Sequence, residues 1–197
     1  VSVYVSEEDC VKDMDINEYL KCVVAAEMPA AFPEEALKAQ AVAARTYQVR
    51  QMQAAGSRAV LYDVGQAYLS EAEQKEKWGE GYALYAGKIH SAVRATAGEI
   101  MTYDGEPILA AFHAQSGGRT EDAAHVWKTA VPYLKSVDSP EGDEVPNYHS
   151  QVVLSSRQVQ EAALAAYPGA DLSGDPSSWF GQAVRDEGGT VTSIPFG

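Results

Sequence analysis

Glu27 is a carboxylate that stands alone in an apolar part of the sequence. It is the only charged side chain between Lys21 and Glu34, and it comes directly before Met28-Pro29. Apolar surroundings penalise a charged carboxylate and favour its protonated form, which suits a general acid. The other interpretation is an ordinary Glu in the last turn of a helix, pointing to solvent, and the pattern alone favours that one.

Polar side chains also recur along the alanine-rich segment that follows. Lys38 and Arg45 are seven residues apart, so a helix would place them almost on one face. Gln40 and Tyr47 share an adjoining face by the same spacing. Such a face could bind a polar ligand or form a solvated stripe, and the pattern alone favours the stripe.

Other catalytic chemistries have weaker signals. The segment Gln115–Gly118 does not match the GxSxG frame of serine hydrolases, although Ser116 with His113 nearby leaves serine chemistry open. Cys10 and Cys22 form no CxxC motif, and they could pair as a disulfide or remain separate thiols. The four histidines share no metal-ligand spacing: His90, His113, His125 and His149.

Composition narrows the classes of partner. The chain has 197 residues, with 28 acidic and 15 basic side chains and a net charge of −13. This charge argues against nucleic acid and against an anionic membrane surface as partners. Hydrophobic residues make up 46% of the chain, as in a folded globular protein, and no apolar run approaches the roughly 18 residues of a membrane span. A membrane anchor could still precede Val1 in a longer protein.

Helix and strand signals predict an α+β fold, with helices around a mixed or antiparallel sheet and β-hairpins. Asp15, with Glu18 as capping-box partner, starts a helix that Pro29 ends after Met28. Pro33 starts a second helix that runs to about Ala55. The other predicted elements are strands at 1–5, 60–68 and 148–155, helices at 82–96 and 156–166, and hairpins at 99–113 and 184–194. We expect one domain over 1–197, with a candidate subdomain boundary near 139–146, where Pro, Gly and acidic residues gather.

A long motif carries a family resemblance. The run YLKCVVAAEMPAAFPEEALKAQAVAARTY, residues 19–47, resembles the signature of the stage II sporulation protein D (SpoIID) family, which includes LytB-type amidase enhancers. Shorter matches follow in the same order: AVRATAGE before YDG, FH before SGGRTE, VW, and PYLKSV. The resemblance spans most of residues 15–140.

The resemblance implies a single-domain lytic transglycosylase that cleaves bacterial peptidoglycan after N-acetylmuramic acid. Its preferred substrate would be glycan strands already stripped of stem peptides by a partner N-acetylmuramoyl-L-alanine amidase. Glu27, the acid of the AEMP motif, would protonate the glycosidic oxygen and then accept the proton of the sugar's own C6 hydroxyl, which leaves a 1,6-anhydro end. The substrate groove would lie next to the two-helix AEMP segment.

The same resemblance suggests which residues line that groove. Lys38, Gln40 and Arg45 would form one wall, although Gln40 and Arg45 could instead brace the loop after Met28. The opposite wall and a sugar-stacking ring would come from Ser116, Gly117, Gly118, Thr120 and Tyr133.

The resemblance also bears on cofactors, on location and on alternative functions. Some family members bind zinc through Cys and His, but Ser116 and the positions of the two cysteines do not fit such a set, so we expect no metal and no cofactor. The expected location is extracytoplasmic, in the cell wall or the forespore intermembrane space, with membrane attachment only through an anchor outside this chain. The alternatives are a non-catalytic amidase enhancer of the same fold and a structural cell-wall protein.

Overall fold

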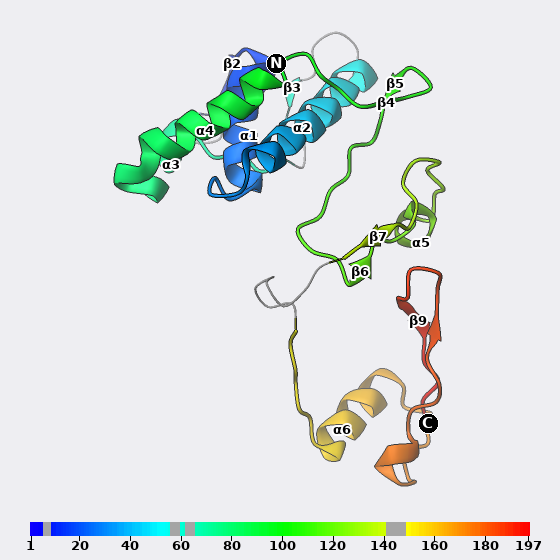
Figure 1. Ribbon diagram of the computed structural model, residues 1–197. Helices are drawn as coiled ribbons and strands as arrows, with labels where there is room; N and C mark the ends of the chain where they lie inside the picture. Colours follow the sequence, from blue (N-terminus) through cyan, green and yellow to red (C-terminus); the bar gives the residue numbers. More distant parts are fainter. Residues whose placement is uncertain (6–8, 56–59, 62–65, 141–148) are drawn as a thin grey trace. The chain divides into compact units, whose positions relative to one another are not determined.

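The computed structural model describes residues 1–5, 9–55, 60–61, 66–140 and 149–197 (Figure 1). The chain forms two compact units, Val1–Phe112 (unit 1) and His113–Gly197 (unit 2). Helices and short paired strands make it an α+β protein, as predicted. The candidate boundary near 139–146 lies mostly on residues 141–148, outside the described residues. A single catalytic domain over the whole chain stays a prediction.

Three helices build unit 1: α1 (Ile16–Glu27), α2 (Glu34–Ala55) and α4 (Tyr82–Ala95). The carboxylate of Asp15 accepts a hydrogen bond from the amide of Asn17 at 2.8 Å and so caps α1, as predicted. Glu18, the expected capping-box partner, forms an ion pair with Lys21 at 2.6 Å. The short α3 (Glu71–Trp78) has a capping box between Ser70 and Glu73 and leads through η1 (Gly79–Gly81) into α4.

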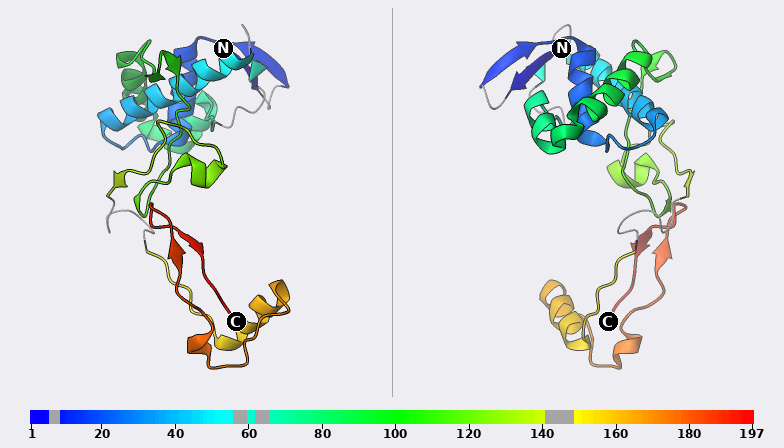
Figure 2. Two further views of the ribbon diagram at one scale, coloured as in Figure 1. Left: turned by 90° about the vertical axis from the view of Figure 1, so that its right-hand side faces the viewer. Right: turned by 60° about the vertical axis from the view of Figure 1, so that its left-hand side comes forward.

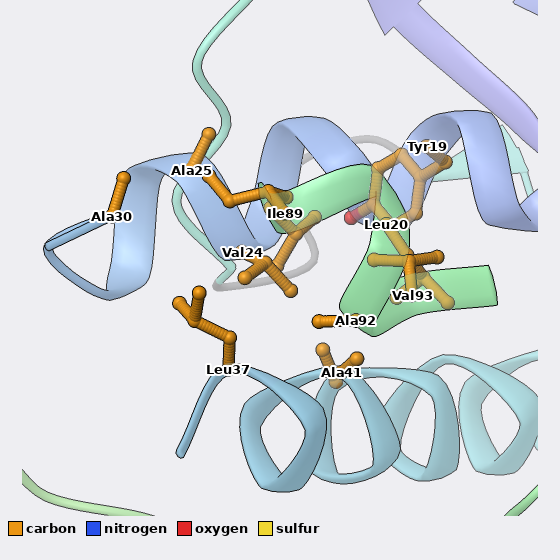
Figure 3. Close-up of a cluster of buried hydrophobic side chains, with 12 residues drawn as sticks. Tyr19, Leu20, Val24, Ala25, Ala30, Leu37, Ala41, Ile89, Ala92 and Val93 are labelled. Atoms are coloured by element: carbon orange, nitrogen blue, oxygen red, sulfur yellow. The ribbon is translucent and has the colours of Figure 1, made fainter. Parts of the chain in front are cut away.

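The hydrophobic core of unit 1 lies where these three helices meet. Ala41 and Ala44 of α2 are fully buried, and their small size allows close contact with the neighbouring helices. Figure 3 shows Leu37 and Ala41 of α2 facing Val24 of α1 and Ala92 of α4. The buried cluster consists of Tyr19, Leu20, Val23, Val24, Ala25, Ala30, Leu37, Ala41, Ala44, Ile89, Ala92 and Val93. Among the described residues, no helix is both long and apolar enough to cross a membrane.

A buried hydroxyl connects α2 to the segment after α4. Thr46 Oγ1 donates to the carbonyl of Val42 at 2.7 Å and accepts from the amide of Met101 at 2.9 Å. We expect Thr46→Val to lower the free energy of unfolding by about 1–3 kcal/mol, because it leaves the Met101 amide without its acceptor. Urea denaturation measures this change. Thr102→Val, at an exposed position, serves as the control and should change stability by less than about 0.5 kcal/mol.

A small mixed sheet lies beside the helices of unit 1 (Figure 2). Strand β1 (Ser2–Val5) pairs antiparallel with β2 (Cys10–Asp13) and parallel with β3 (Val60–Leu61). The predicted strand at 60–68 is therefore too long: it covers Val60 and Leu61, residues 62–65 lie outside the described part, and residues 66–68 are not strand. Residues 66–69 form hydrogen bonds with α1 and α2 instead, and the carbonyl of Leu69 also accepts from the side chain of Gln74 on α3.

The predicted hairpin at 99–113 forms, but it is short. Strands β4 (Thr102–Tyr103) and β5 (Glu106–Pro107) enclose Asp104 and Gly105, both with positive φ, as the turn dipeptide predicted. The amide of Ile108 still donates to the carbonyl of Met101 at 3.1 Å, but residues 108–113 are not strand.

Unit 2 has little regular structure. Strand β6 (Gly118–Arg119) pairs with β7 (Asp138–Ser139), and α5 (Ala123–Trp127) lies between them in sequence. The final hairpin is confirmed as β8 (Val184–Arg185) with β9 (Val191–Ser193). The helix α6 (Ser156–Ala166) is also confirmed, although its capping residue is Ser155 rather than Ser156, and η2 (Pro176–Ser178) follows.

The predicted strand at 148–155 is wrong for its described part. Residues 149–155 belong to no strand, and the side chains of Val152 and Val153 are 81% and 83% exposed. A strand also needs a partner, and among the described residues no strand pairs with this segment.

Candidate active site

Glu27 is the last residue of α1, and its side chain is half-buried at the surface of unit 1. The carboxylate Oε1 accepts a hydrogen bond from the amide of Ala67 at 3.0 Å. The preceding Val23 and Val24 are completely buried because they face the helical core. The apolar neighbours in sequence therefore do not enclose the carboxylate. This differs from the expected apolar setting and leaves Glu27 open to a ligand.

The segment Gln66–Leu69 holds the carboxylate in place. The amide of Leu69 donates to the carbonyl of Cys22 at 3.1 Å, so the segment lies along α1. Gln66 accepts from the hydroxyl of Tyr19 at 3.2 Å and donates to the carbonyl of Ala44 on α2 at 3.3 Å. Sequence reasoning missed this segment because Gln-Ala-Tyr-Leu carries no charge and matches no catalytic pattern.

Two tyrosines stack next to this segment. The rings of Tyr19 and Tyr68 lie 5.9 Å apart at 26°, and Tyr68 keeps 37% of its surface exposed. Burial raises the pKa of Tyr19 to about 12, and burial together with a hydrogen bond to Cys22 raises the pKa of Tyr68. Both phenols are therefore neutral at physiological pH. Burial also raises the pKa of the Cys22 thiol, and Cys10 and Cys22 form no disulfide with each other.

The loop after Glu27 is fixed from α4. The amide of Phe32 donates to the carbonyl of Pro29 at 2.9 Å, which closes a turn, and Ala30 is buried in the core. The ammonium of Lys88 donates to the carbonyls of Phe32 and, at 3.3 Å, of Ala31. Phe32 itself is 47% exposed, so the loop presents an aromatic ring to solvent just after the candidate acid.

Arg45 lies in the interior of unit 1, where it is 2% exposed. Its guanidinium donates to the carbonyls of Val93 and Glu99, both at 3.1 Å, and makes longer contacts of 3.4 Å with Asn17 and Thr96. Burial lowers the pKa of this guanidinium. The arrangement joins α1, α2 and the end of α4, so Arg45 braces the helices. It does not brace the loop after Met28 and does not lie at a groove surface.

Lys38 and Gln40 also do not form the common groove wall that the resemblance suggested. Lys38 is partly exposed and forms ion pairs with Glu35 at 2.7 Å and Glu34 at 3.5 Å, one turn earlier on α2. Gln40 is 6% exposed, and its Nε2 has no hydrogen-bond partner among the described residues. In this structure Lys38 belongs to a solvated stripe and Gln40 to the helix interface.

The remaining predicted site residues belong to unit 2. Ser116, Gly117 and Thr120 line a cleft of about 650 Å³ together with two arginines, Arg119 and Arg185. The cleft is completed by His113, Gln115, Glu121, Gly188, Gly189 and Thr190. The structure thus brings three of the predicted residues together around one cleft within unit 2.

The hydroxyls of that group also hold the local fold. Ser116 Oγ donates to the carbonyl of Ser139 at 2.9 Å rather than to His113, which does not favour a serine nucleophile. Thr120 Oγ1 accepts from the amide of Val137 at 3.0 Å. Gly118 adopts φ +99°, a conformation that a residue with Cβ rarely takes. Tyr133 is half-buried in the turn before β7 and does not line the cleft.

A second cleft, of about 590 Å³, lies in unit 1 but away from Glu27. It is lined by the first turn of α1, including Asp15 and Asn17, and by the C-terminal half of α4, including His90 and Arg94. The 12 residues of α1 span about 18 Å, and Glu27 is at the other end. A substrate groove next to Glu27 stays a prediction.

Sequence comparison connects this site to known proteins. The sequence model of the Stage II sporulation protein family (SpoIID) matches residues 4–103, which include Glu27, Arg45 and Gln66. Stage II sporulation protein D of Bacillus subtilis (strain 168) is 41% identical over 168 residues, covering 82% of this chain and 49% of that protein. The Bacillus amyloliquefaciens protein of the same name is 40% identical over 181 residues, covering 88% of this chain and 53% of that protein.

A relative with a different name also matches. The amidase enhancer of Bacillus subtilis (strain 168) is 30% identical over 175 residues, covering 89% of this chain and 21% of that protein. The family match covers most of unit 1, the helical unit that carries Glu27. The chain therefore belongs to the Stage II sporulation protein (SpoIID) family. It spans about half the length of the two stage II sporulation protein D relatives.

Proposed function

We propose that the chain carries the catalytic part of a peptidoglycan lytic transglycosylase, with Glu27 as both general acid and general base. The observation that supports this most is the state of Glu27: a single carboxylate, accessible at the end of α1 and fixed by the Ala67 amide. A reaction that needs one acid–base group is compatible with this site. Family membership supports a role in cell-wall processing during sporulation.

The proposed reaction balances without water. Protonated Glu27 donates its proton to the glycosidic oxygen after N-acetylmuramic acid, and the bond between that oxygen and C1 breaks. The C6 hydroxyl of the same sugar attacks C1 and returns its proton to the Glu27 carboxylate, leaving a 1,6-anhydro ring. The Ala67 amide occupies Oε1, so Oε2 is the oxygen available for both proton transfers. An intramolecular nucleophile also avoids the entropic cost of association.

Other residues are proposed to bind the glycan strand or to position the helices. Phe32, in the loop after Glu27, and Tyr68, next to the Ala67 amide that binds Glu27, are both partly exposed and offer ring faces for sugars. The cleft of unit 2, with Ser116, Gly117 and two arginines, is a proposed binding surface for the glycan strand. Lys38 stays a candidate for contact with the strand, as do Gly118, Thr120 and Tyr133, whereas Arg45 and Gln40 are assigned to positioning of the helices.

The amidase enhancer relative supports a partnership with an N-acetylmuramoyl-L-alanine amidase that strips stem peptides first. Denuded glycan strands are then the proposed substrate, and the proposed location is outside the cytoplasm, in the cell wall or the forespore intermembrane space. The same relative's name favours a second candidate function, a non-catalytic enhancer that binds glycan and stimulates the amidase.

One experiment separates the two candidates. The protein is incubated with denuded glycan strands, and the products are analysed by mass spectrometry; in parallel, amidase activity is measured on intact peptidoglycan with and without the protein. We expect new anhydromuramic ends from the denuded strands. Stimulation of the amidase without any anhydromuramic product would reject the enzyme and favour the enhancer.

Gln66 provides a further test of the geometry around Glu27. Gln66→Ala removes the hydrogen bonds to Tyr19 and Ala44 that fix the segment carrying the Ala67 amide. We expect kcat on denuded strands to fall by up to about 10²-fold with little change in KM, because small displacements of a catalytic group are costly. Gln51→Ala, which removes a hydrogen bond to Tyr47 on the same helix, is the matched control. A rise in KM with kcat unchanged would argue that Gln66 binds substrate directly.

A further inference from the structure

A second group of titratable side chains lies within unit 2, apart from the proposed catalytic residue. Glu121 precedes α5, His125 lies on α5, and Asp186 follows β8. Each offers one ligand atom, and these atoms all lie within 4.8 Å of one another. Residues from two separate parts of the chain thus place two carboxylates and one imidazole around a common point.

The carboxylates are held in place, and one oxygen of Glu121 has no hydrogen-bond partner among the described residues. The side chain of Asp186 is only 9% exposed; its Oδ1 accepts from the amide of Thr190 at 3.0 Å, and its Oδ2 lies 3.5 Å from His125 Nδ1. Glu121 Oε1 accepts from the hydroxyl of Thr190. The other oxygen, Glu121 Oε2, is fully buried and has no hydrogen-bond partner among the described residues.

Such an arrangement is costly without a cation. A buried carboxylate oxygen without a donor loses its hydration, and two adjacent carboxylates repel each other. The backbone also leaves no room for another side chain here, since a Cβ on Gly188 would lie 2.9 Å from Glu121 Oε1. A small positive ion would satisfy Oε2 and screen both carboxylates at once.

We propose that Glu121, His125 and Asp186 bind a divalent transition-metal ion of the Zn²⁺ type. Ligand atoms bound to Zn²⁺ at about 2.0–2.2 Å around a tetrahedron are roughly 3.3–3.6 Å apart, and the His125–Asp186 pair already has that spacing. Imidazole favours Zn²⁺ over Mg²⁺ and Ca²⁺, which prefer sites made of oxygen atoms alone. Water would complete the coordination.

The expectation of no metal was based on ligand sets made of Cys and His. Two of the three ligands here are carboxylates, so the spacing of the histidines gave no signal for this site. The third ligand, Asp186, is 61 positions after His125 in the sequence. The bound ion would link α5 to the β8–β9 hairpin and stabilise unit 2, so the proposal does not depend on the enzymatic activity.

Metal binding and thermal unfolding test the proposal together. The full chain is freed of metal with a chelator and titrated calorimetrically with ZnCl₂, and with MgCl₂ for comparison. We expect one Zn²⁺ per chain, a higher unfolding temperature with Zn²⁺, and Mg²⁺ binding at least about tenfold weaker. Glu121→Gln and His125→Gln should each weaken Zn²⁺ binding by at least about tenfold and remove the thermal shift.

Two controls keep the test decisive. His149→Gln removes another exposed histidine of unit 2 and should leave the Zn²⁺ affinity unchanged. Far-UV circular dichroism of each metal-free variant checks that the fold is intact. The proposal is overturned if no Zn²⁺ binds, if Mg²⁺ binds equally well, or if Glu121→Gln and His125→Gln bind Zn²⁺ like the wild type. Equal weakening by His149→Gln would indicate adventitious binding to histidines and would overturn it too.

Discussion

Glu27→Gln is expected to lower kcat on denuded glycan strands by about 10²–10⁴-fold, the usual contribution of general acid–base catalysis. Glutamine keeps the size of the side chain and an oxygen that can accept from the Ala67 amide. It cannot donate and recover the proton that the mechanism requires. Strand binding and KM should therefore change little, and the release of anhydromuramic ends, quantified by mass spectrometry, measures the loss.

Glu35→Gln is the matched control for this variant. Glu35 is an exposed carboxylate on α2 that pairs with Lys38 on the same helix. Its replacement should leave turnover within about twofold, since an exposed ion pair contributes little energy. If Glu27→Gln kept the turnover of the wild type, Glu27 could not be the acid.

Arg45→Ala is expected to lower the free energy of unfolding by about 2–4 kcal/mol. The change removes a large buried side chain and its hydrogen bonds to the carbonyls of Val93 and Glu99. Chemical denaturation followed by circular dichroism measures the loss. Arg50→Ala, at an exposed position of α2 whose guanidinium donates to the carbonyl of Pro107, should cost less than about 1 kcal/mol.

Variants at Arg45 also separate bracing of the helices from the groove-lining role that the resemblance suggested. A bracing residue affects stability first, so Arg45→Lys, which keeps the charge and part of the volume, should be intermediate in stability and bind glycan strands normally. Wild-type stability combined with a loss of strand binding would instead assign Arg45 to the groove.

The elements of unit 1 could largely be predicted because their signals are local. Asp15, Pro29 and Pro33 mark the ends of α1 and α2, and the Asp104-Gly105 turn marks the short hairpin. The longer strands that alternation predicted did not form, because a strand also needs a partner, and alternation along one segment carries no information about it. Val152 and Val153 show this, since they lie in the predicted strand at 148–155 and are exposed in the structure.

The candidate site was only partly predictable for a related reason. Glu27 was identified by its lack of charged neighbours and by the AEMP resemblance, both of which are visible in the sequence. The role of Gln66 depends on hydrogen bonds to two helices across 47 and 22 positions, and Arg45 reaches the end of α4 in the same manner. Helical spacing placed Arg45 beside Lys38, but the packing of α4 decides that one is buried and the other is solvated.

The fate of water is the most direct test of the proposed reaction. Denuded glycan strands are digested in water enriched in ¹⁸O, and the new muramic ends are analysed by mass spectrometry. The proposed mechanism predicts anhydro ends that contain no ¹⁸O, because the attacking oxygen is the sugar's own C6 hydroxyl. Reducing ends that carry ¹⁸O and are one water heavier would show hydrolysis and contradict the account.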